Sequence, residues 1–231
     1  MRYSLLLLVF TFNVSISHAI KLGTYPIPLM VESADKGIFV ELSKELAKRS
    51  GVPMEIIVAP PKRTLADFSD KSIDAFFPAL DVLLQGPAAK TTPVYVKVDF
   101  IFFKKGTPFK TLADLKGKTV GITAGYPYVK DVTETKLFTI EPAPSDEQNI
   151  MKLEAGRIAA FIVEEKTGLK ALAEVGVTDI AYAHDSPISK QDVFYAFQNT
   201  TEGQALAEKF SGAIKSIQSD GTFQKLMAPA H

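Results

Sequence analysis

Apolar and polar residues alternate between strand-like and helix-like spacing along most of the chain. Residues 20–24 have the alternation of a strand, and residues 37–51 place apolar side chains on one helical face before Gly51 ends the segment. A further strand is predicted over 54–60. A strand, a helix and a second strand in this order favour a βαβ unit, and hence an α/β protein.

The order helix, turn, strand then occurs twice, in residues 63–81 and again in residues 149–166. Each copy has a helix with an apolar stripe, a small or polar turn, and a short apolar strand that starts at an isoleucine. Two copies about 85 residues apart predict two similar α/β lobes.

Two β-rich runs, residues 94–106 and 192–200, separate these copies from the neighbouring segments. We expect the chain to cross from the first lobe to the second near residue 103 and to return near residue 190. Two crossing strands would form a hinge, with a ligand-binding region between the lobes. Two amphipathic helices, split at Asp220-Gly221, would then complete the first lobe.

The first 19 residues have the pattern of a secretory signal peptide. Arg2 precedes an apolar run from Leu5 to Phe12, and the stretch ends in Ser17-His18-Ala19. The run is shorter than the roughly 20 residues that a membrane-spanning helix needs. We therefore expect cleavage after Ala19 and a periplasmic mature protein, without a lipid anchor because no cysteine follows the run.

Composition narrows the functional classes. The chain has 26 basic and 26 acidic residues, which does not suggest the clustered basic face of a nucleic-acid-binding protein. It has no cysteine, so it has no disulfide scaffold, no cysteine-based zinc site and no thiol nucleophile. No metal-spaced cluster or cofactor motif stands out, and the sequence predicts neither a metal nor a cofactor.

One glycine-rich stretch, DLKGKTVGITAGYPYV at residues 114–129, contains the Gly-Lys-Thr with which a phosphate-binding P-loop ends. A P-loop needs another glycine five residues before Gly117, where this chain has Leu112. A P-loop also follows a strand, whereas here the strand-like residues 119–122 come after the Gly-Lys-Thr. The stretch therefore predicts a strand and a turn that hold something other than a nucleotide.

Four motifs together resemble the extracellular solute-binding proteins of ABC importers, in the small two-lobed class best known for polar amino acids. They occur in the order of that family, from about residue 20 to the end of the chain, and are SIDAFF, LADLKGKTVGITAG, LEAGRIAAFIVEE and IKSIQSDGTFQKL. The resemblance implies a periplasmic-binding-protein fold of type II, with two three-layer lobes joined by two crossing hinge strands. Lobe one would span 20–103 plus 191–231, and lobe two 104–190.

The resemblance also implies a function. Such a protein captures a small polar metabolite, here an amino acid or a related amine or carboxylate, by closing its lobes, because the ligand binds the closed form better. It then presents the closed form to the membrane permease of an ABC importer. We expect this chain to act as a monomer and as a binder rather than an enzyme.

In the family that the chain resembles, the turn after the TVGI strand starts a helix whose free N–H groups face the ligand. Thr123, Ala124, Gly125 and Tyr126 occupy that turn here. A helix N-terminus suits a carboxylate, Thr123 would add a hydroxyl, and Gly125 would let the backbone approach closely. The alternative is a plain strand-to-helix turn that Thr123 caps.

The chain departs from the family pattern at the residue that grips the α-carboxylate of an amino acid. The family carries an arginine after the IDA strand, but residues 79–95 contain no arginine, and Lys90 is the only cation among them. Arg63, at the start of a predicted helix, is one candidate substitute. The alternative is that Arg63 is an ordinary surface charge.

Two carboxylates are candidates for binding a ligand's ammonium group. Glu164 ends the GRIAAFIV strand, where the family carries such a carboxylate, and Asp81 ends the matching strand of the first lobe. Glu165 follows Glu164, and strand alternation would direct the two side chains to opposite sides. The alternative is that both glutamates cap the next helix.

Aromatic residues at predicted strand ends and loops are candidates to stack on a ring or to surround a quaternary ammonium. They are Tyr25, Phe76, Phe77, Tyr126 and Tyr128. Because Phe76 and Phe77 are consecutive, at least one of them is expected in the core. Tyr25 and Tyr126 are the stronger candidates.

Two other functions stay open on the sequence alone. A periplasmic sensing subunit would use the same closing lobes to signal to a membrane receptor. A few relatives of this fold are dehydratases of the cyclohexadienyl type, which act on prephenate-like acids, and Glu164 is the one well-placed general acid for such a reaction.

Overall fold

A computed structural model describes residues 18–228 of the 231-residue chain. Most of the predicted signal peptide, residues 1–17, lies outside the described residues. Among the residues that are described, no helix is both long and apolar enough to cross a membrane.

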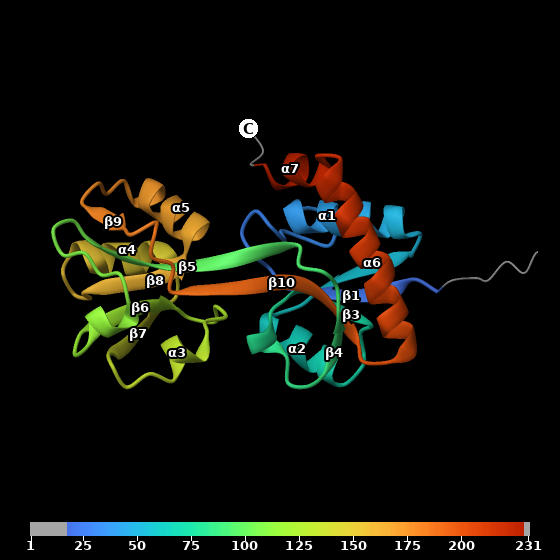
Figure 1. The fold of residues 1–231 in the computed structure, drawn as a ribbon, viewed down its shortest axis with the longest axis horizontal. Coiled ribbons are helices and arrows are strands. Elements are labelled where there is room, and N and C mark those ends of the chain that lie inside the picture. Colours follow the sequence, from blue (N-terminus) through green and yellow to red (C-terminus); the bar gives the residue numbers. More distant parts are fainter. Residues whose placement is uncertain (1–17, 229–231) are drawn as a thin grey trace, which may run out of the picture.

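Two α/β lobes are joined by the two longest strands of the described chain, β5 (Tyr95–Lys104) and β10 (Ser189–Gln198) (Figure 1). These strands pair antiparallel, from Ser189 opposite Asp99 to Val193 opposite Tyr95. Each strand then continues into the sheet of a different lobe. The predicted two-lobed α/β fold with two crossing strands is confirmed.

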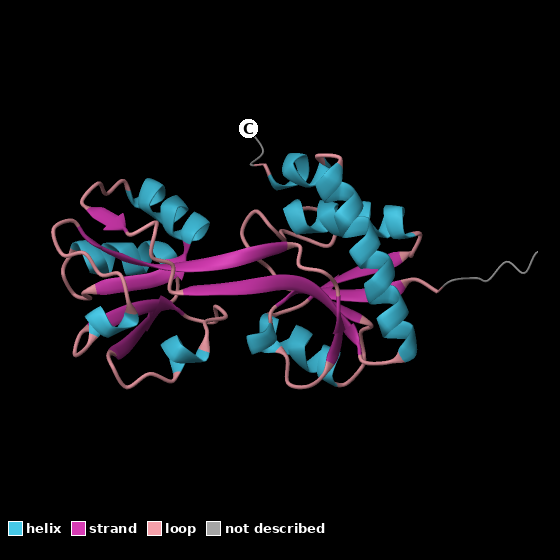
Figure 2. Cartoon of the chain, viewed as in Figure 1, coloured by secondary structure: helices cyan, strands magenta, loops and turns pink. Residues whose placement is uncertain are grey.

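The first lobe has a sheet between helices on both faces (Figures 1 and 2). Besides β10, its elements are β1 (Ile20–Thr24), α1 (Ile38–Ser50), β2 (Met54–Val58), α2 (Pro61–Ser69), β3 (Ala75–Ala79), the 3-10 helix η1 (Asp81–Leu83), β4 (Ala88–Lys90), α6 (Thr201–Ser219) and α7 (Thr222–Met227). Strands β2, β1 and β3 are parallel, and β10 is antiparallel to β3. Helices α1, α6 and α7 cover one face, and α2 covers the other.

The second lobe repeats this arrangement. Besides β5, its elements are the 3-10 helix η2 (Leu112–Leu115), β6 (Thr119–Thr123), α3 (Lys130–Thr133), β7 (Thr139–Ala143), α4 (Asp146–Glu154), β8 (Ala160–Glu164), α5 (Glu165–Val175) and β9 (Ile180–Tyr182). Strands β7, β6 and β8 are parallel, and β5 is antiparallel to β8. Helices α4 and α5 cover one face, while η2 and α3 lie on the other.

Consecutive aromatic residues of the central strands bury their side chains on opposite faces of each sheet. In β3, Phe77 packs on the α1 side and Phe76 on the α2 side. In β5, Phe100 and Phe102 pack with α4 and α5, and Phe103 packs on the opposite face. This alternation explains why β3 and residues 100–103 of β5 are apolar: both faces of the sheet are covered there.

The part of β5 from Phe100 onward packs entirely within the second lobe, and Tyr95 packs with the first. A lobe boundary near Asp99 therefore suits the packing better than the predicted boundary at 103. The division into 20–103 plus 191–231 and 104–190 stays a proposal in which this limit would move by a few residues.

Local sequence signals explain where the helices begin and end. Helix α1 ends at Gly51, whose φ of 68° is left-handed and suits glycine. Ser145 and Thr200 accept hydrogen bonds from the first turns of α4 and α6. The predicted helices over 37–51 and on either side of Asp220-Gly221 are confirmed.

Candidate functional site

The carboxyl ends of strands from both lobes carry most of the predicted ligand contacts. Tyr25 follows β1, Asp81 follows β3, the turn 123–126 follows β6, and Glu164 ends β8. In open α/β sheets, ligands bind outside the carboxyl ends of the strands. The structure brings some of these residues together and separates others.

Tyr95 of the first-lobe side lies within electrostatic reach of Tyr25 and of Glu164, which belongs to the second lobe. Burial raises the pKa of Tyr25 to about 12. Burial also raises the pKa of Tyr95, and the charge of Glu164 and the neighbouring Tyr25 raise it further. Strand ends of both lobes thus contribute to one region.

Tyr126 connects this region to Asp146, the first residue of α4. The Tyr126 hydroxyl donates to Asp146 Oδ2 at 3.1 Å, and the buried Thr123 hydroxyl donates to Asp146 Oδ1. The pKa of Tyr126 is raised by burial first, then by Asp146, and also by the charge of Glu164. Tyr126 therefore lies near both carboxylates.

Glu164 and Glu165 point to different surroundings. Glu164 Oε2 accepts a hydrogen bond from the Thr167 N–H at 3.0 Å, so Glu164 caps α5 as the alternative interpretation expected. Glu165 Oε1 accepts from the Tyr182 hydroxyl at 2.8 Å and lies 3.5 Å from His184 Nε2. Glu164 therefore caps α5 and also lies near Tyr95, whereas Glu165 is turned toward β9.

We call Tyr25, Tyr95, Tyr126, Asp146 and Glu164 the interlobe acidic group. Burial raises the pKa of both carboxyl groups, against hydrogen bonds that lower it. Among the described residues, no ion pair includes Asp146 or Glu164, although Asp146 is only 7% exposed. A positive charge placed beside them would favour their ionised forms and be held in return.

Arg63 and Asp81 each form an ion pair with a residue outside the interlobe acidic group. The Arg63 side chain is 72% exposed, and its Nε donates to Asp67 Oδ1 at 2.7 Å within α2. This is the surface-charge alternative that the sequence left open. Asp81 forms an ion pair with Lys90, the one cation that the sequence placed near the missing arginine.

The turn after β6 differs from the predicted helix start. The next helix, α3, begins only at Lys130 and ends at Thr133. Three backbone N–H groups of the turn are already bonded within the second lobe: Thr123 to the Tyr128 hydroxyl, Ala124 to the Ala143 carbonyl and Tyr126 to the Thr123 carbonyl. Gly125 has a φ of 83°, and a Cβ there would meet no atom, so the backbone conformation alone accounts for the glycine.

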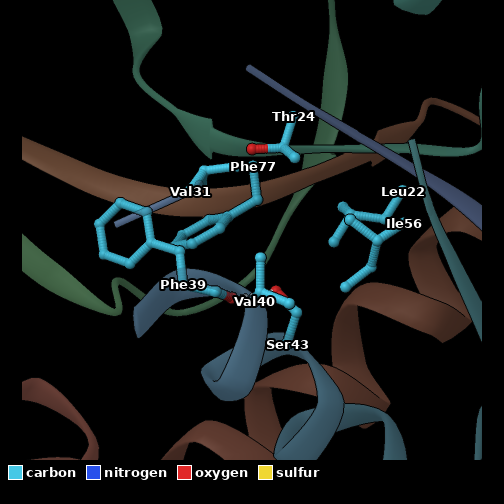
Figure 3. Close-up of a pocket in the computed structure, with 8 residues that line it drawn as sticks. All are labelled: Leu22, Thr24, Val31, Phe39, Val40, Ser43, Ile56 and Phe77. Atoms are coloured by element: carbon cyan, nitrogen blue, oxygen red, sulfur yellow. Dashed lines mark hydrogen bonds between the residues drawn. The ribbon is translucent and has the colours of Figure 1, made fainter. Parts of the chain in front are cut away.

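The structure does not support the prediction that Phe77 contacts a ligand. Its side chain is 1% exposed and stacks on the Tyr195 ring at 4.0 Å between centroids. It lines a narrow, mainly apolar crevice inside the first lobe, together with the residues labelled in Figure 3. Phe76 is fully buried on the opposite face, where its ring lies beside that of Tyr25, so both phenylalanines belong to the core.

The two crossing strands carry a buried polar set that was not predicted from the sequence and that we call the hinge network: Lys97, Asp99, Ser189 and Gln191. Lys97 forms an ion pair with Asp99, and Ser189 Oγ donates to Asp99 Oδ2 at 2.6 Å. Gln191 Nε2 donates to the Pro127 carbonyl at 3.1 Å, which ties the hinge to the turn that carries Tyr126. The sequence contained a signal for this set, because Lys97 and Asp99 share one face of a strand whose other residues from Tyr95 to Phe103 are apolar.

Comparison with curated proteins places the chain among relatives named for amino-acid binding, while no protein-family model matches it. The L-cystine-binding protein TcyJ of Escherichia coli (strain K12) is 28% identical over 215 residues, 88% of this chain and 78% of that protein. The ABC transporter arginine-binding protein 1 of the same strain is 27% identical over 240 residues, 96% of this chain and 94% of that protein. The predicted resemblance to amino-acid-binding proteins of ABC transporters is confirmed.

Solved structures support the fold. The ligand-binding core of GluR0 from Nostoc punctiforme, in complex with L-glutamate, superposes with a TM-score of 0.71 at 17% identity and covers 90% of this chain and 96% of that one. A histidine kinase sensor domain with similarity to periplasmic binding proteins superposes with a TM-score of 0.69 at 17% identity, covering 90% of this chain and 94% of that one. The fold is therefore that of periplasmic binding proteins.

Proposed function

We propose that this chain is a periplasmic solute-binding protein that captures a small polar metabolite by closing its two lobes and delivers it to the permease of an ABC importer. The metabolite is an amino acid or a related amine or carboxylate. The observation that carries the proposal is the interlobe acidic group, in which Glu164 of the second lobe lies within electrostatic reach of Tyr95 on the first-lobe side and of Tyr126 in its own lobe.

Closure follows from the way the lobes are connected. Only β5 and β10 pair between the two halves of the sheet, so a small change in their twist turns one lobe relative to the other. A ligand that contacts both lobes binds the closed form better and shifts the equilibrium toward it. The relatives, named as binding proteins rather than enzymes, support binding without turnover.

A thermal-shift screen tests the proposal. The purified protein would first be unfolded and refolded to remove carried-over ligand, then screened against amino acids, amines, betaines, small carboxylates, sugars and prephenate-like acids. A ligand at 100 times its Kd adds about 2.7 kcal/mol of stability. For a protein of this size we expect Tm to rise by roughly 5–10 °C. A hit recovered chemically unchanged supports binding, a converted hit indicates an enzyme, and no hit at all contradicts the proposal.

A sensing role is the second candidate, because one structure of the same fold is a histidine kinase sensor domain. Both roles use the same ligand-driven closure. Genes for a permease and an ATPase beside this gene would support import, and a membrane kinase or cyclase gene would support sensing.

A further inference from the structure

The parallel strands β6 and β8 of the second lobe separate before they reach their carboxyl ends. Their pairing ends at Gly121, which lies opposite Phe161. Beyond this pair, β6 stays paired with β7 and β8 stays paired with β5, as far as their last residues. The two strands therefore diverge just before the turn 123–126 and Glu164, so whatever holds them apart sets the spacing of these predicted ligand contacts.

The register of β6 and β8 shows which backbone hydrogen bond is replaced where they diverge. Continued beyond Gly121, the register would place Thr123 opposite Val163. In a parallel ladder an N–H group donates to the carbonyl of the residue before its partner, as Thr139 donates to Lys118 between β7 and β6. The Thr123 N–H would therefore donate to the Ile162 carbonyl if the two strands stayed paired.

Tyr128, in the loop after β6, occupies the place of this bond. Its hydroxyl accepts from the Thr123 N–H at 3.0 Å and donates to the Ile162 carbonyl at 3.1 Å. One oxygen atom thus stands between a donor and an acceptor that the register would join directly. Because all three residues are buried, the hydroxyl supplies hydrogen bonds that bulk water cannot supply there.

Contacts around its ring keep Tyr128 in this position. The ring stacks with that of Tyr126 at 6.5 Å between centroids, and the Lys97 ammonium lies 5.4 Å from its centroid. The preceding carbonyl, that of Pro127, accepts from Gln191 Nε2 at 3.1 Å. Since Lys97 and Gln191 belong to the hinge network, the crossing strands help to hold the tyrosine between β6 and β8.

We propose that Tyr128 is a positioning residue, a buried wedge that keeps the ends of β6 and β8 apart and so sets the distance between the turn 123–126 and Glu164. The inference rests on the proposed function, because the turn and Glu164 are predicted ligand contacts of the second lobe. It gives Tyr128 a role other than stacking on a ligand, since the ring is only 5% exposed and the hydroxyl already both donates and accepts.

Two substitutions distinguish a wedge from a simple tether between the strands. Tyr128→Phe keeps the ring but removes the hydroxyl, so the strands stay apart and the Thr123 N–H loses its acceptor. Tyr128→Leu is too short to reach between the strands, so they close and the Thr123 N–H bonds directly to the Ile162 carbonyl. We expect the Thr123 amide hydrogen to exchange at least about tenfold faster than in the parent for the Phe variant, and within about threefold of the parent for the Leu variant.

NMR of the purified protein measures both effects. Amide hydrogen exchange reports the protection of Thr123, and a scalar coupling from its nitrogen to the Ile162 carbonyl carbon identifies the direct bond. Fast exchange in both variants would show that Tyr128 only tethers the strands, and slow exchange in both would show that its hydroxyl is not the acceptor of the Thr123 N–H. Either result would overturn the proposal.

Tyr195→Phe is the matched control. It removes another buried tyrosine hydroxyl, which bonds to Ser43 Oγ at 2.7 Å within the first lobe, and it should leave the exchange of Thr123 within about twofold of the parent. Equal acceleration in Tyr128→Phe and Tyr195→Phe would mean that Thr123 reports only on global unfolding, which contradicts the proposal. This comparison decides the role of the hydroxyl even if the Leu variant does not fold.

Ligand binding separates failure of this inference from failure of the proposed function. L-Arginine, L-glutamate and L-serine serve as a cationic, an anionic and a neutral probe in calorimetric titrations. A probe that binds the parent should bind Tyr128→Leu at least about tenfold more weakly and Tyr195→Phe within about twofold. Unchanged binding by Tyr128→Leu would overturn the positioning role and leave a solute-binding protein. If the parent binds neither these probes nor the thermal-shift panel, the solute-binding function fails, and the exchange of Thr123 still decides whether Tyr128 separates the strands.

Discussion

Buried carboxylates have different partners in the two crossing strands and in the strand ends beside them. In the hinge network, Asp99 is 1% exposed and bonds to Lys97, Ser189 and Gln191, so its charge is fully matched. In the interlobe acidic group, Asp146 is nearly as buried but receives only hydroxyl donors. The carboxylate of the first set has a cationic partner within the protein, and the carboxylate of the second set forms no ion pair among the described residues.

This difference suits a structural role for the hinge network and a ligand-binding role for the interlobe acidic group. A buried ion pair with its remaining oxygens satisfied keeps two strands in register, and removal of either partner is costly. Buried carboxylates without a cation cost stability in the free protein, and such residues occur where a ligand supplies what is missing. The comparison therefore predicts that removing the charge of Asp99 lowers the stability of the protein, whereas removing the charge of Glu164 raises it.

The largest effect is expected for Asp99→Ala. The substitution leaves Lys97 as an uncompensated buried charge and removes the acceptor of the Ser189 hydroxyl. We expect the free energy of unfolding to fall by about 3–5 kcal/mol, measured by urea denaturation. A loss below about 1 kcal/mol would show that the hinge network is not structural.

A double substitution serves as the control. Replacing Lys97 and Asp99 together by Met and Leu removes both charges and fills the space with apolar atoms. Such replacements of buried pairs are often neutral or stabilising, so the double variant should recover most of the loss of Asp99→Ala. If the double variant instead loses about the sum of the stabilities lost by the two single variants, Lys97 and Asp99 do not act as a coupled pair.

Tyr126→Phe is expected to have an intermediate effect. It removes the hydroxyl that donates to Asp146 at 3.1 Å and leaves the ring in place. The loss should be about 0.5–1.5 kcal/mol by urea denaturation, because one hydrogen bond between side chains disappears. The pKa of Asp146 should also rise further, which titration by NMR would detect, and an unchanged pKa would contradict the hydrogen bond.

The fold was largely predictable because both lobes repeat one apolar pattern. Strands such as β3 and helices such as α1 have the period, the end glycine or the length that identifies them locally. The two crossing strands followed from two β-rich runs placed symmetrically around the second lobe. The helix predicted after residue 126 failed, because Pro127 and the internal bonds of the turn keep the backbone extended until Lys130.

The site was less predictable because it depends on contacts across the lobes. Glu164 could be placed at a strand end, but the sequence did not show that Asp146, eighteen residues earlier, would lie near the same tyrosine. Arg63 was a reasonable candidate by position, yet a local partner four residues later pairs with it. Phe77 failed because its strand is covered on both faces, which leaves consecutive residues no open side.

The substitution Glu164→Gln should slightly raise the stability of the protein. Burial raises the pKa of Glu164, so its ionised form is disfavoured in the folded protein. Without ligand at neutral pH, the substitution should stabilise by up to about 1 kcal/mol, measured by urea denaturation beside Glu165→Gln. A clear loss of stability at neutral pH would mean that the capping of α5 outweighs the buried charge.

The stability gained by Glu164→Gln should decrease as pH falls. Folded Glu164 binds its proton at higher pH than the unfolded chain does, so its cost is present above the folded pKa and disappears below the unfolded value of about 4.3. Unfolding curves of the parent and Glu164→Gln should therefore converge as pH falls. If the difference stays constant with pH, it does not come from ionisation of Glu164.

Asp220, an exposed residue between α6 and α7, provides the opposite case and the smallest expected change in stability. Hydrogen bonds from Thr222 and Arg49 lower its pKa to about 2. The ionised form is favoured in the folded protein, so Asp220→Asn should lower the urea midpoint slightly at neutral pH, and this difference should shrink as pH falls toward about 2. The Glu164 and Asp220 variants should thus approach the parent from opposite sides on acidification. Approach from the same side would show that burial does not decide the sign at Glu164.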